Sequence, residues 1–264
     1  MTFHAFGFSD IQQAELGWGS CQPALQLRPW IEHYYLVRPQ GSYTFFRLYP
    51  DGGSTLTIPL DNPRPETCQF GHSIDGGQRL WQPSHACLGI RFAPGGFYAL
   101  FGMAIAEINK QATGWLTDLP GLAQLCELVA ESHPGDITKL NRFFLQRLSR
   151  RSAVVGAVQL WQEAGLRAPQ ELLSMLRQKG VGRRTLERKF QVQVGVSPGQ
   201  LYTWQRLKLA RNMLRNWPAQ RSTDIALSLG YYDQPHFVRQ FRQHCGQTPN
   251  QYRQRKLSQF YNQE

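Results

Sequence analysis

A short pattern that occurs twice near the C-terminus constrains this chain more than any other feature. Residues 186–190 (Leu-Glu-Arg-Lys-Phe) and residues 237–241 (Phe-Val-Arg-Gln-Phe) lie 51 positions apart and place an arginine between two apolar side chains. Apolar residues at positions i and i+4 lie on one face of a helix. Each copy therefore predicts a helix that is held to a core by one face and leaves polar side chains on the other.

The residues that follow each copy also match, and they predict how each helix ends and the next one begins. A glycine five residues on suits a left-handed helix cap, and a hydroxyl residue followed by proline suits the first turn of a new helix. The matching pairs are Gly195 and Gly246, Ser197 and Thr248, and Pro198 and Pro249.

A further short helix and a tight turn are predicted before each copy. Residues 171–176 lead to a Gly-Val-Gly turn at 180–182, and residues 224–229 lead to Gly230 and Tyr231. Helix, glycine turn, helix is the plan of the helix-turn-helix motif, in which the second helix enters the major groove of DNA. A helical bundle without a DNA role is the plainer alternative.

The charge of the chain favours the DNA reading. Residues 1–150 hold 11 Lys and Arg against 12 Asp and Glu, whereas residues 151–264 hold 18 against 6, so the second half carries the whole formal net charge of +11. A cationic region gains binding free energy when it displaces counterions from a polyanion. A membrane surface is disfavoured as a partner because this half shows no single amphipathic anchor helix.

Cysteine usage and hydropathy predict a soluble, cytoplasmic protein. The five cysteines are scattered and include no Cys-x-x-Cys pair, which argues against a disulfide framework and a zinc knuckle. The sequence has no apolar run of about 18 residues, and its first ten residues do not resemble a signal peptide.

The first half of the chain predicts strands and turns. Residues 43–49, 54–58 and 87–92 are rich in aromatic and β-branched side chains and are bounded by Gly-rich turns. The pattern becomes helical from about residue 136. An apolar stripe there predicts a helix that ends at Arg150 and Arg151; the stripe consists of Leu140, Phe143, Phe144, Leu145 and Leu148. We therefore expect a β-rich domain at 1–150 and a helical domain at 151–264, with the boundary near residues 150–155.

Residues 155–257 resemble the DNA-binding domain of the AraC/XylS family of transcription regulators. Residues 224–241 are the most specific stretch, with residues 246–249 and 252–253 completing the similarity. The resemblance implies an all-α domain with two helix-turn-helix subdomains joined by a long helix over residues 200–216, roughly 25 Å long. The two recognition helices would then lie about one DNA turn, 34 Å, apart. Pro235 departs from the family pattern and removes one base-contacting side chain.

The N-terminal half is similar, less specifically, to an AraC-type sensing domain. Residues 27–34, 47–52 and 88–95 carry the resemblance, which implies a cupin-like β-barrel or sandwich with flanking helices. The expected fold is therefore α+β with two domains. The His-x-His pattern of metal-binding cupins and the phosphate-binding glycine motifs are absent, so no metal or other cofactor is expected.

Side chains that face away from the core of each recognition helix are the candidates for DNA contact. Arginine suits guanine, glutamine suits adenine, glutamate accepts from cytosine, and valine can meet a thymine methyl; the alternative for any one of them is a phosphate contact or a solvated side chain. His236 is expected to pack rather than to contact a base. The candidates are Arg183, Arg184, Glu187, Arg188 and Gln191 in the first helix and Gln234, His236, Val238, Arg239 and Arg242 in the second.

Aromatic side chains of the first half are candidates for a small-molecule pocket, with simple core packing as the alternative. They are Trp30, Tyr34, Tyr49 and Trp81, with Trp18 beside them and Arg91 as a polar group.

The sequence thus predicts a non-enzymatic, ligand-responsive regulator of promoter DNA, and it leaves the effector and the choice between activation and repression open. Expected partners are double-stranded DNA, a small-molecule effector, RNA polymerase and a second copy of the chain. The apolar stripes at 104–108 and 137–148 are candidates for dimerisation, with packing against the chain's own barrel as the alternative. The alternatives are an alkyltransferase-like enzyme using Cys68 or Cys87, a purely dimerising N-terminal domain, and an architectural DNA binder without sequence preference.

Overall fold

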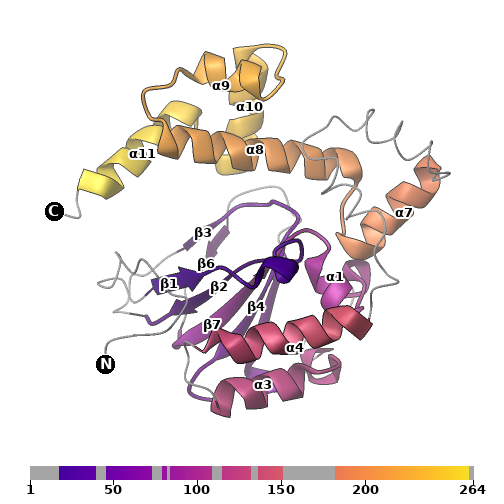
Figure 1. The fold of residues 1–264 in the computed structure, drawn as a ribbon. Helices are drawn as coiled ribbons and strands as arrows, with labels where there is room; N and C mark the ends of the chain where they lie inside the picture. The colour runs from indigo at the N-terminus through magenta and orange to yellow at the C-terminus, as the bar shows by residue number, and fades with distance from the viewer. Residues whose placement is uncertain are drawn as a thin grey trace.

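The computed structural model describes a β-rich part and a helical part (Figure 1). The described residues are 18–39, 46–72, 79–81, 84–108, 115–131, 136–150 and 182–261. The expected helix at 171–176, most of the turn at 180–182 and the expected boundary at 150–155 lie outside them, apart from Arg150 and Gly182 at the edges. No helix among these residues has the length and apolar character needed to cross a membrane.

Seven strands form two antiparallel sheets. They are β1 (Trp18–Cys21), β2 (Ile31–Val37), β3 (Phe46–Leu48), β4 (Ser54–Pro59), β5 (Gln69–His72), β6 (Arg79–Trp81) and β7 (Cys87–Phe92). The five-stranded sheet has the order β1-β2-β7-β4-β5, and β3 pairs with β6 in a two-stranded sheet. The antiparallel β-rich architecture expected from the sequence is confirmed, and within the described part of the chain it consists of these two sheets.

Strand periodicity gives the five-stranded sheet one apolar face. Successive side chains of a strand point to opposite faces. In β4, Leu56 and Ile58 are fully buried in the core, whereas Thr57 lies on the other face, where the hydroxyl of Tyr35 is 3.5 Å from its Oγ1. In β7, Leu88 and Ile90 follow the same rule.

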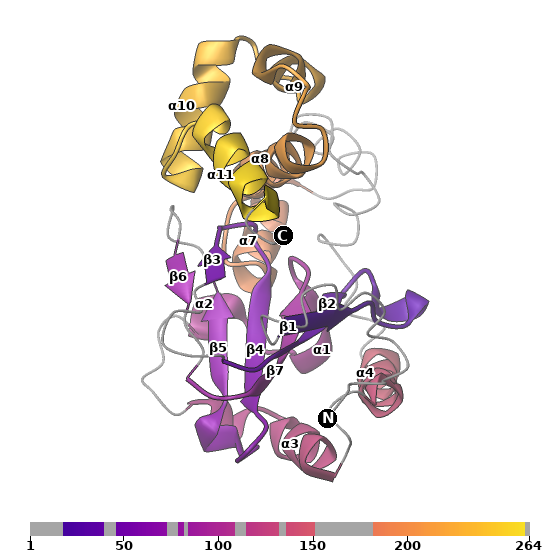
Figure 2. The same cartoon turned by 90° about the vertical axis from the view of Figure 1, so that its left-hand side faces the viewer.

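Helices cover the apolar face (Figure 2). They are α1 (Gly96–Phe101), α2 (Ile105–Ile108), α3 (Leu122–Glu131) and α4 (Ile137–Arg150), with 3-10 turns at Leu25–Leu27, Pro65–Thr67 and Trp115–Asp118. The described part of helix α4 reaches Arg150, within the helical stretch that its apolar spacing predicted.

The apolar stripe of α4 does not provide the dimer surface that the sequence suggested. Leu140 is 4% exposed, Phe144 is fully buried, and Leu148 packs against the same core. Ile105 and Ile108, in the other suggested stripe, are also buried. Both stripes pack against the protein's own β-rich core, which was the alternative to a dimer surface.

The helical part contains α7 (Arg183–Gln193), α8 (Pro198–Asn216), α9 (Ser222–Ser228), α10 (Gln234–Cys245) and α11 (Pro249–Tyr261). Helix α8 has 19 residues and is therefore roughly 28 Å long. It is the long connecting helix expected between the two repeat copies, and α9 and α10 form the second helix-turn-helix unit (Figure 1).

The predicted cap chemistry is present at both repeat copies. Gly195 and Gly246 have φ angles of 81° and 70°, in the left-handed region that favours glycine. Ser197 Oγ accepts a hydrogen bond from the Gln200 amide, and Thr248 Oγ1 accepts one from the Gln251 amide. Each cap fixes the direction in which the chain leaves a recognition helix.

Candidate nucleic-acid interface

Helix α10 separates a buried apolar face from an exposed polar face. Phe237 and Phe241 are fully buried and pack in a core formed with α8, α9 and α11. Gln234, Arg239 and Arg242 are exposed. A helix held in this way presents its polar side chains to solvent, as the recognition helix of a helix-turn-helix motif does.

The start of α10 is fixed by two residues. Asp233 Oδ1 accepts a hydrogen bond from the His236 amide at 2.7 Å, and Pro235 lies in the first turn. An acidic N-cap satisfies a free amide and interacts favourably with the helix dipole. Pro235 is compatible with this position because its missing amide has no partner within the helix.

Two of the predicted α10 contact residues are partly covered. The ring of His236 lies edge-on to Tyr231, with ring centroids 5.6 Å apart, and Val238 packs against the core of the helical part. This contact is the kind of packing that the sequence led us to expect for His236. Gln234, Arg239 and Arg242 are therefore the more exposed of the predicted contact residues on α10.

Helix α7 repeats the same division in the first copy. Leu186 and Phe190 are fully buried, whereas Arg184, Arg188 and Gln191 are exposed. The start of α7 is less firmly fixed than that of α10, because Gly182 occupies the N-cap position and provides no side-chain cap.

An ion pair on α7 was not anticipated. Arg183 Nε lies 2.8 Å from Glu187 Oε1, and the two side chains are 70% and 44% exposed. This hydrogen bond and the nearby carboxylate raise the pKa of Arg183. The i,i+4 spacing of opposite charges is the sequence signal that could have revealed the pair. Glu187 has to leave Arg183, or share it, before it contacts a cytosine.

A cation–π contact connects α8 to the turn that precedes α10. The guanidinium carbon of Arg206 lies 3.7 Å from the centroid of the Tyr231 ring and 5.2 Å from that of Tyr202. Burial raises the pKa of the Tyr231 hydroxyl to about 12. Arg206 therefore supports the position of the second recognition helix from behind, a role that the sequence analysis did not identify.

The residues predicted to line a small-molecule pocket do not come together. Trp30 and Tyr34 are buried in the core beneath the helices, whereas Tyr49 packs against the helical part and Arg91 binds Asp51. The side chains of Trp18 and Trp81 lie outside the described residues. For Trp30 and Tyr34, the alternative of simple core packing holds.

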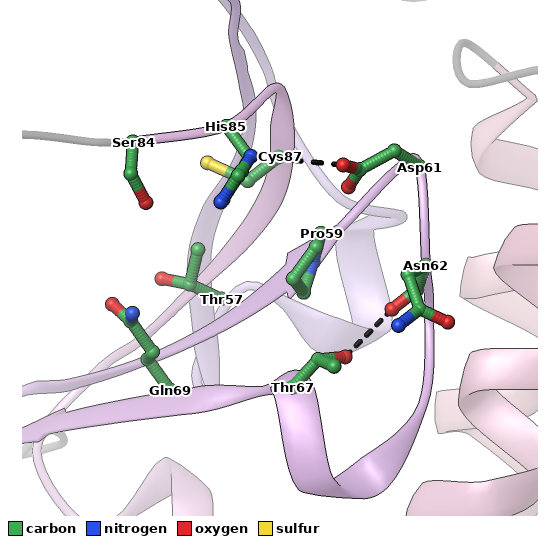
Figure 3. A pocket seen from close by; sticks show the side chains of 9 residues that line it. All are labelled: Thr57, Pro59, Asp61, Asn62, Thr67, Gln69, Ser84, His85 and Cys87. Carbon is green, nitrogen blue, oxygen red and sulfur yellow. Dashed lines mark hydrogen bonds and ion pairs between the residues drawn. The ribbon is translucent and has the colours of Figure 1, made fainter.

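A cavity of about 380 Å³ opens on the opposite, polar face of the five-stranded sheet (Figure 3). Its lining consists largely of hydroxyl, amide and other polar side chains: Thr57, Pro59, Asp61, Asn62, Thr67, Gln69, Ser84, His85 and Cys87. His85 Nδ1 lies 3.6 Å from Asp61 Oδ2, and Thr67 Oγ1 donates a 2.6 Å hydrogen bond to the Asn62 carbonyl. The sequence analysis missed this site because its residues come from β4, β5, β7 and two loops.

The two cysteines considered as nucleophiles are buried. Burial raises the pKa of the Cys87 thiol to about 12. A hydrogen bond with Cys126, whose Sγ is 3.6 Å away, and burial together raise the pKa of Cys68. Because the thiolate is the reactive form, neither environment favours nucleophilic attack near neutral pH.

Comparison with known families gives two matches, one toward each end of the chain. Residues 175–255 match the family HTH_18, a helix-turn-helix domain, and residues 20–113 match DUF6597, a domain of unknown function. No curated protein sequence matches the chain.

Among solved structures, the chain is similar to ToxT from Vibrio cholerae. One 1.65 Å structure is 12% identical, with 83% of this chain and 97% of that chain covered and a TM-score of 0.37. A second, bound to (E)-4-(8-methylnaphthalen-1-yl)but-3-enoic acid, is 13% identical at the same TM-score and covers 83% of this chain and 96% of that one. These are distant likenesses.

Proposed function

Since this chain is a DNA-binding regulator with an AraC-type helix-turn-helix domain, we propose that α7 and α10 contact base edges in two successive major grooves of promoter DNA. Arg184, Arg188 and Gln191 of α7 and Gln234, Arg239 and Arg242 of α10 are the principal contact residues. Arg183, Glu187, His236 and Val238 make secondary contacts. The division near residue 150 separates this domain from a sensing domain.

One observation carries the proposal. At equivalent positions of the two repeat copies, the apolar side chains are fully buried and the arginine between them is exposed. Arg188 and Arg239 are that pair of arginines, two residues after Leu186 and Phe237 respectively. A bidentate arginine is the commonest specific contact to guanine. An architectural DNA binder would need the cationic surface. It would not need an arginine at the same position of two helices that both end in a glycine cap.

Selection of DNA from a random duplex library by the full chain tests the proposal. We expect enriched sequences with two conserved blocks whose centres are about 10 base pairs apart, one for each recognition helix. Sequences without any conserved block would favour the architectural alternative. A single block would show that only one of the two helices contacts bases.

A second function, binding of a small polar effector, is supported by the cavity in Figure 3. Its volume lies at the lower end of the range of small-molecule sites, about 300–1,000 Å³. Thr57 and Gln69 offer hydrogen-bonding groups on neighbouring strands. We expect an uncharged, hydroxyl- or amide-bearing molecule to fit this lining better than a fatty or strongly anionic one.

Thermal unfolding in the presence of a panel of polar metabolites tests the effector site. A ligand of the cavity should raise the midpoint for the wild type but not for Thr57→Trp, in which the larger side chain fills the space. Gln124→Trp, at an exposed position of α3 outside the cavity lining, is the matched control and should keep the shift. A ligand that still raises the unfolding midpoint of Thr57→Trp binds outside the cavity.

The remaining assignments follow from promoter binding. We place the protein in the cytoplasm, where it would reach chromosomal DNA and act on RNA polymerase, and we assign it no enzymatic activity because the candidate thiols are buried. A second copy of the chain stays a candidate partner through a surface other than the α4 stripe. Intact mass spectrometry after exposure to alkylated DNA would contradict the non-enzymatic assignment if Cys68 or Cys87 gained an alkyl group.

A further inference from the structure

Residues 49–53, between β3 and β4, connect the β-rich part to the helical part. This short segment contacts α8 through its charged and glycine residues and contacts α10 and α11 through Tyr49. This one segment of the β-rich part therefore contacts three helices of the helical part: α8, α10 and α11.

Four charged side chains form the first half of this contact. Lys208 of α8 places its Nζ 2.5 Å from Glu32 Oε1 and 3.1 Å from Asp51 Oδ2. Asp51 also binds Arg91, and Arg91 donates a 3.0 Å hydrogen bond to Thr55 Oγ1. The side chain of Asp51 is only 7% exposed, so its charge depends on these two cations. Burial alone would raise the pKa of Asp51, but Arg91 and Lys208 outweigh it and hold the pKa below its usual range.

The aromatic ring of Tyr49 forms the second half. The guanidinium carbon of Arg211 lies 4.2 Å from its centroid, and the ring of His244 stacks on it at 6.4 Å. The Tyr49 hydroxyl accepts a 3.0 Å hydrogen bond from Arg255. These three partners come from α8, α10 and α11, so a single side chain of the β-rich part contacts all three helices.

The backbone between them packs closely against α8. Gln205 Nε2 donates a 2.6 Å hydrogen bond to the Asp51 carbonyl. Gly52 has a φ angle of 80°, and a Cβ at this position would collide with Leu201 Cδ1. Glycine is therefore required here both by the backbone conformation and by the approach of α8.

The β-rich part also holds the first recognition helix. Helix α7 packs against α1 and α2, and Gly195, at its C-terminal end, faces Ile105 of α2. The β-rich part therefore contacts α7 at one end of α8 and the α10–α11 pair at the other (Figure 1).

From this arrangement we infer that Lys208, Asp51 and Tyr49 are positioning residues that fix the separation of the two recognition helices and thereby the operator spacing the protein prefers. None of the exposed arginines proposed to contact bases takes part in the contact. The segment therefore supports the DNA-binding surface from the opposite side and does not cover it. Because this contact already holds the recognition helices in place, less conformational entropy is lost when they bind DNA.

The test rests on the proposed function and uses the full chain with two duplexes: a selected operator, and the same operator with about five base pairs, half a turn, inserted between its blocks. Lys208→Met removes the charge that binds Asp51 and Glu32 but keeps an unbranched side chain of similar length. We expect it to weaken binding to the selected operator by about tenfold and to reduce the difference in affinity between the two duplexes. Lys208→Arg should restore most of the preference.

Arg215→Met is the matched control, because Arg215 is an exposed cation on the same helix whose side chain binds neighbouring Asn216. It should leave the spacing preference unchanged. Tyr49→Phe, which removes only the hydroxyl bound to Arg255, is a milder variant that gives a second measurement if Lys208→Met folds poorly. Amide exchange of residues 49–53 should be faster in Lys208→Met than in Arg215→Met.

Each outcome bears on one proposal. Loss of the spacing preference together with faster exchange supports the positioning role. An unchanged preference with faster exchange would overturn it, as would tighter operator binding by Lys208→Met, which would show an inhibitory contact. A wild-type chain that prefers neither duplex over random DNA would contradict the proposed function itself and not the positioning role.

Discussion

Arg239 and Phe241 lie two residues apart on α10 and have opposite environments. Phe241 is fully buried against Phe237 and Tyr252, whereas Arg239 is exposed. Phe241→Ala should leave a cavity and destabilise the protein by about 3–5 kcal/mol. Arg239→Ala should leave the unfolding midpoint nearly unchanged and weaken only DNA binding. Thermal unfolding of both variants beside the wild type measures the difference, and a cooperative loss of folding in Arg239→Ala would show that the helix faces the other way.

The burial of single residues could be predicted from the sequence where helical spacing determines it. Leu186, Phe190, Phe237 and Phe241 follow from i,i+4 periodicity, which a single helix imposes. Sequence did not predict contacts that join distant residues, such as that of Lys208 with Glu32. Aromatic composition misled the pocket prediction, because a buried tryptophan such as Trp30 and a ligand-contacting one look alike in sequence.

At the scale of elements, Asp233 caps the start of α10 through a hydrogen bond with the His236 amide. Asp233→Ala removes the acceptor of the His236 amide and should destabilise the protein by about 1 kcal/mol. Asp233→Asn keeps the acceptor and should recover most of that loss. Chemical denaturation of the two variants checks this, and equal destabilisation by both would show that the charge, rather than the capping bond, matters.

Element boundaries were predicted well where local chemistry sets them. Helix α8 begins at Pro198 because Ser197 caps it, as the Ser-Pro pair predicted. Sheet pairing was not predictable in the same way. Strands β3 and β4 are joined by a tight turn, yet β3 pairs with β6, about 30 residues further on, and β4 pairs with β5 and β7. A turn sequence determines where the chain bends but not which strand becomes the partner.

At the scale of the whole molecule, two histidines make the contact between the parts sensitive to acid: His244 is buried and His72 is partly buried. Burial lowers the pKa of His72 to about 4, and burial with the Arg211 charge lowers that of His244 to about 4. His72 lies 3.2 Å from the Gly53 carbonyl, and His244 stacks on Tyr49. The unfolded chain binds more protons than the folded chain between about pH 6.5 and 4, so stability should fall as pH falls through that window.

Thermal midpoints at pH 7, 5.5 and 4.5, values chosen to span that window, measure this dependence. Each histidine contributes on the order of 3 kcal/mol at most to the change. His244→Gln should flatten the dependence, whereas His85→Gln, at an exposed rim position, should not. The lowered pKa of Asp51 places the loss of its contribution at lower pH, outside the same window. If the unfolding midpoint changes equally with pH in the wild type and in His244→Gln, His244 is not a source of the pH dependence.

The division of charge predicts where DNA affinity resides. A fragment of residues 152–264 should bind duplex DNA, with affinity that falls steeply as salt rises, and a fragment of residues 1–150 should not. Fluorescence anisotropy of both fragments at several salt concentrations measures this. Equal binding by the two fragments would contradict the assignment of DNA binding to the helical domain.

The central claim is that α7 and α10 contact separate blocks of one operator. Binding titrations of full-length Arg188→Ala and Arg239→Ala against operators with single base-pair changes, at several salt concentrations, test it most directly. We predict that each variant loses about 1–3 kcal/mol and relaxes preference at one base pair, in a different block for each variant. Uniform weakening of all operators by both variants, with the salt slope reduced by about one, would contradict the claim and show that these arginines contact only phosphate.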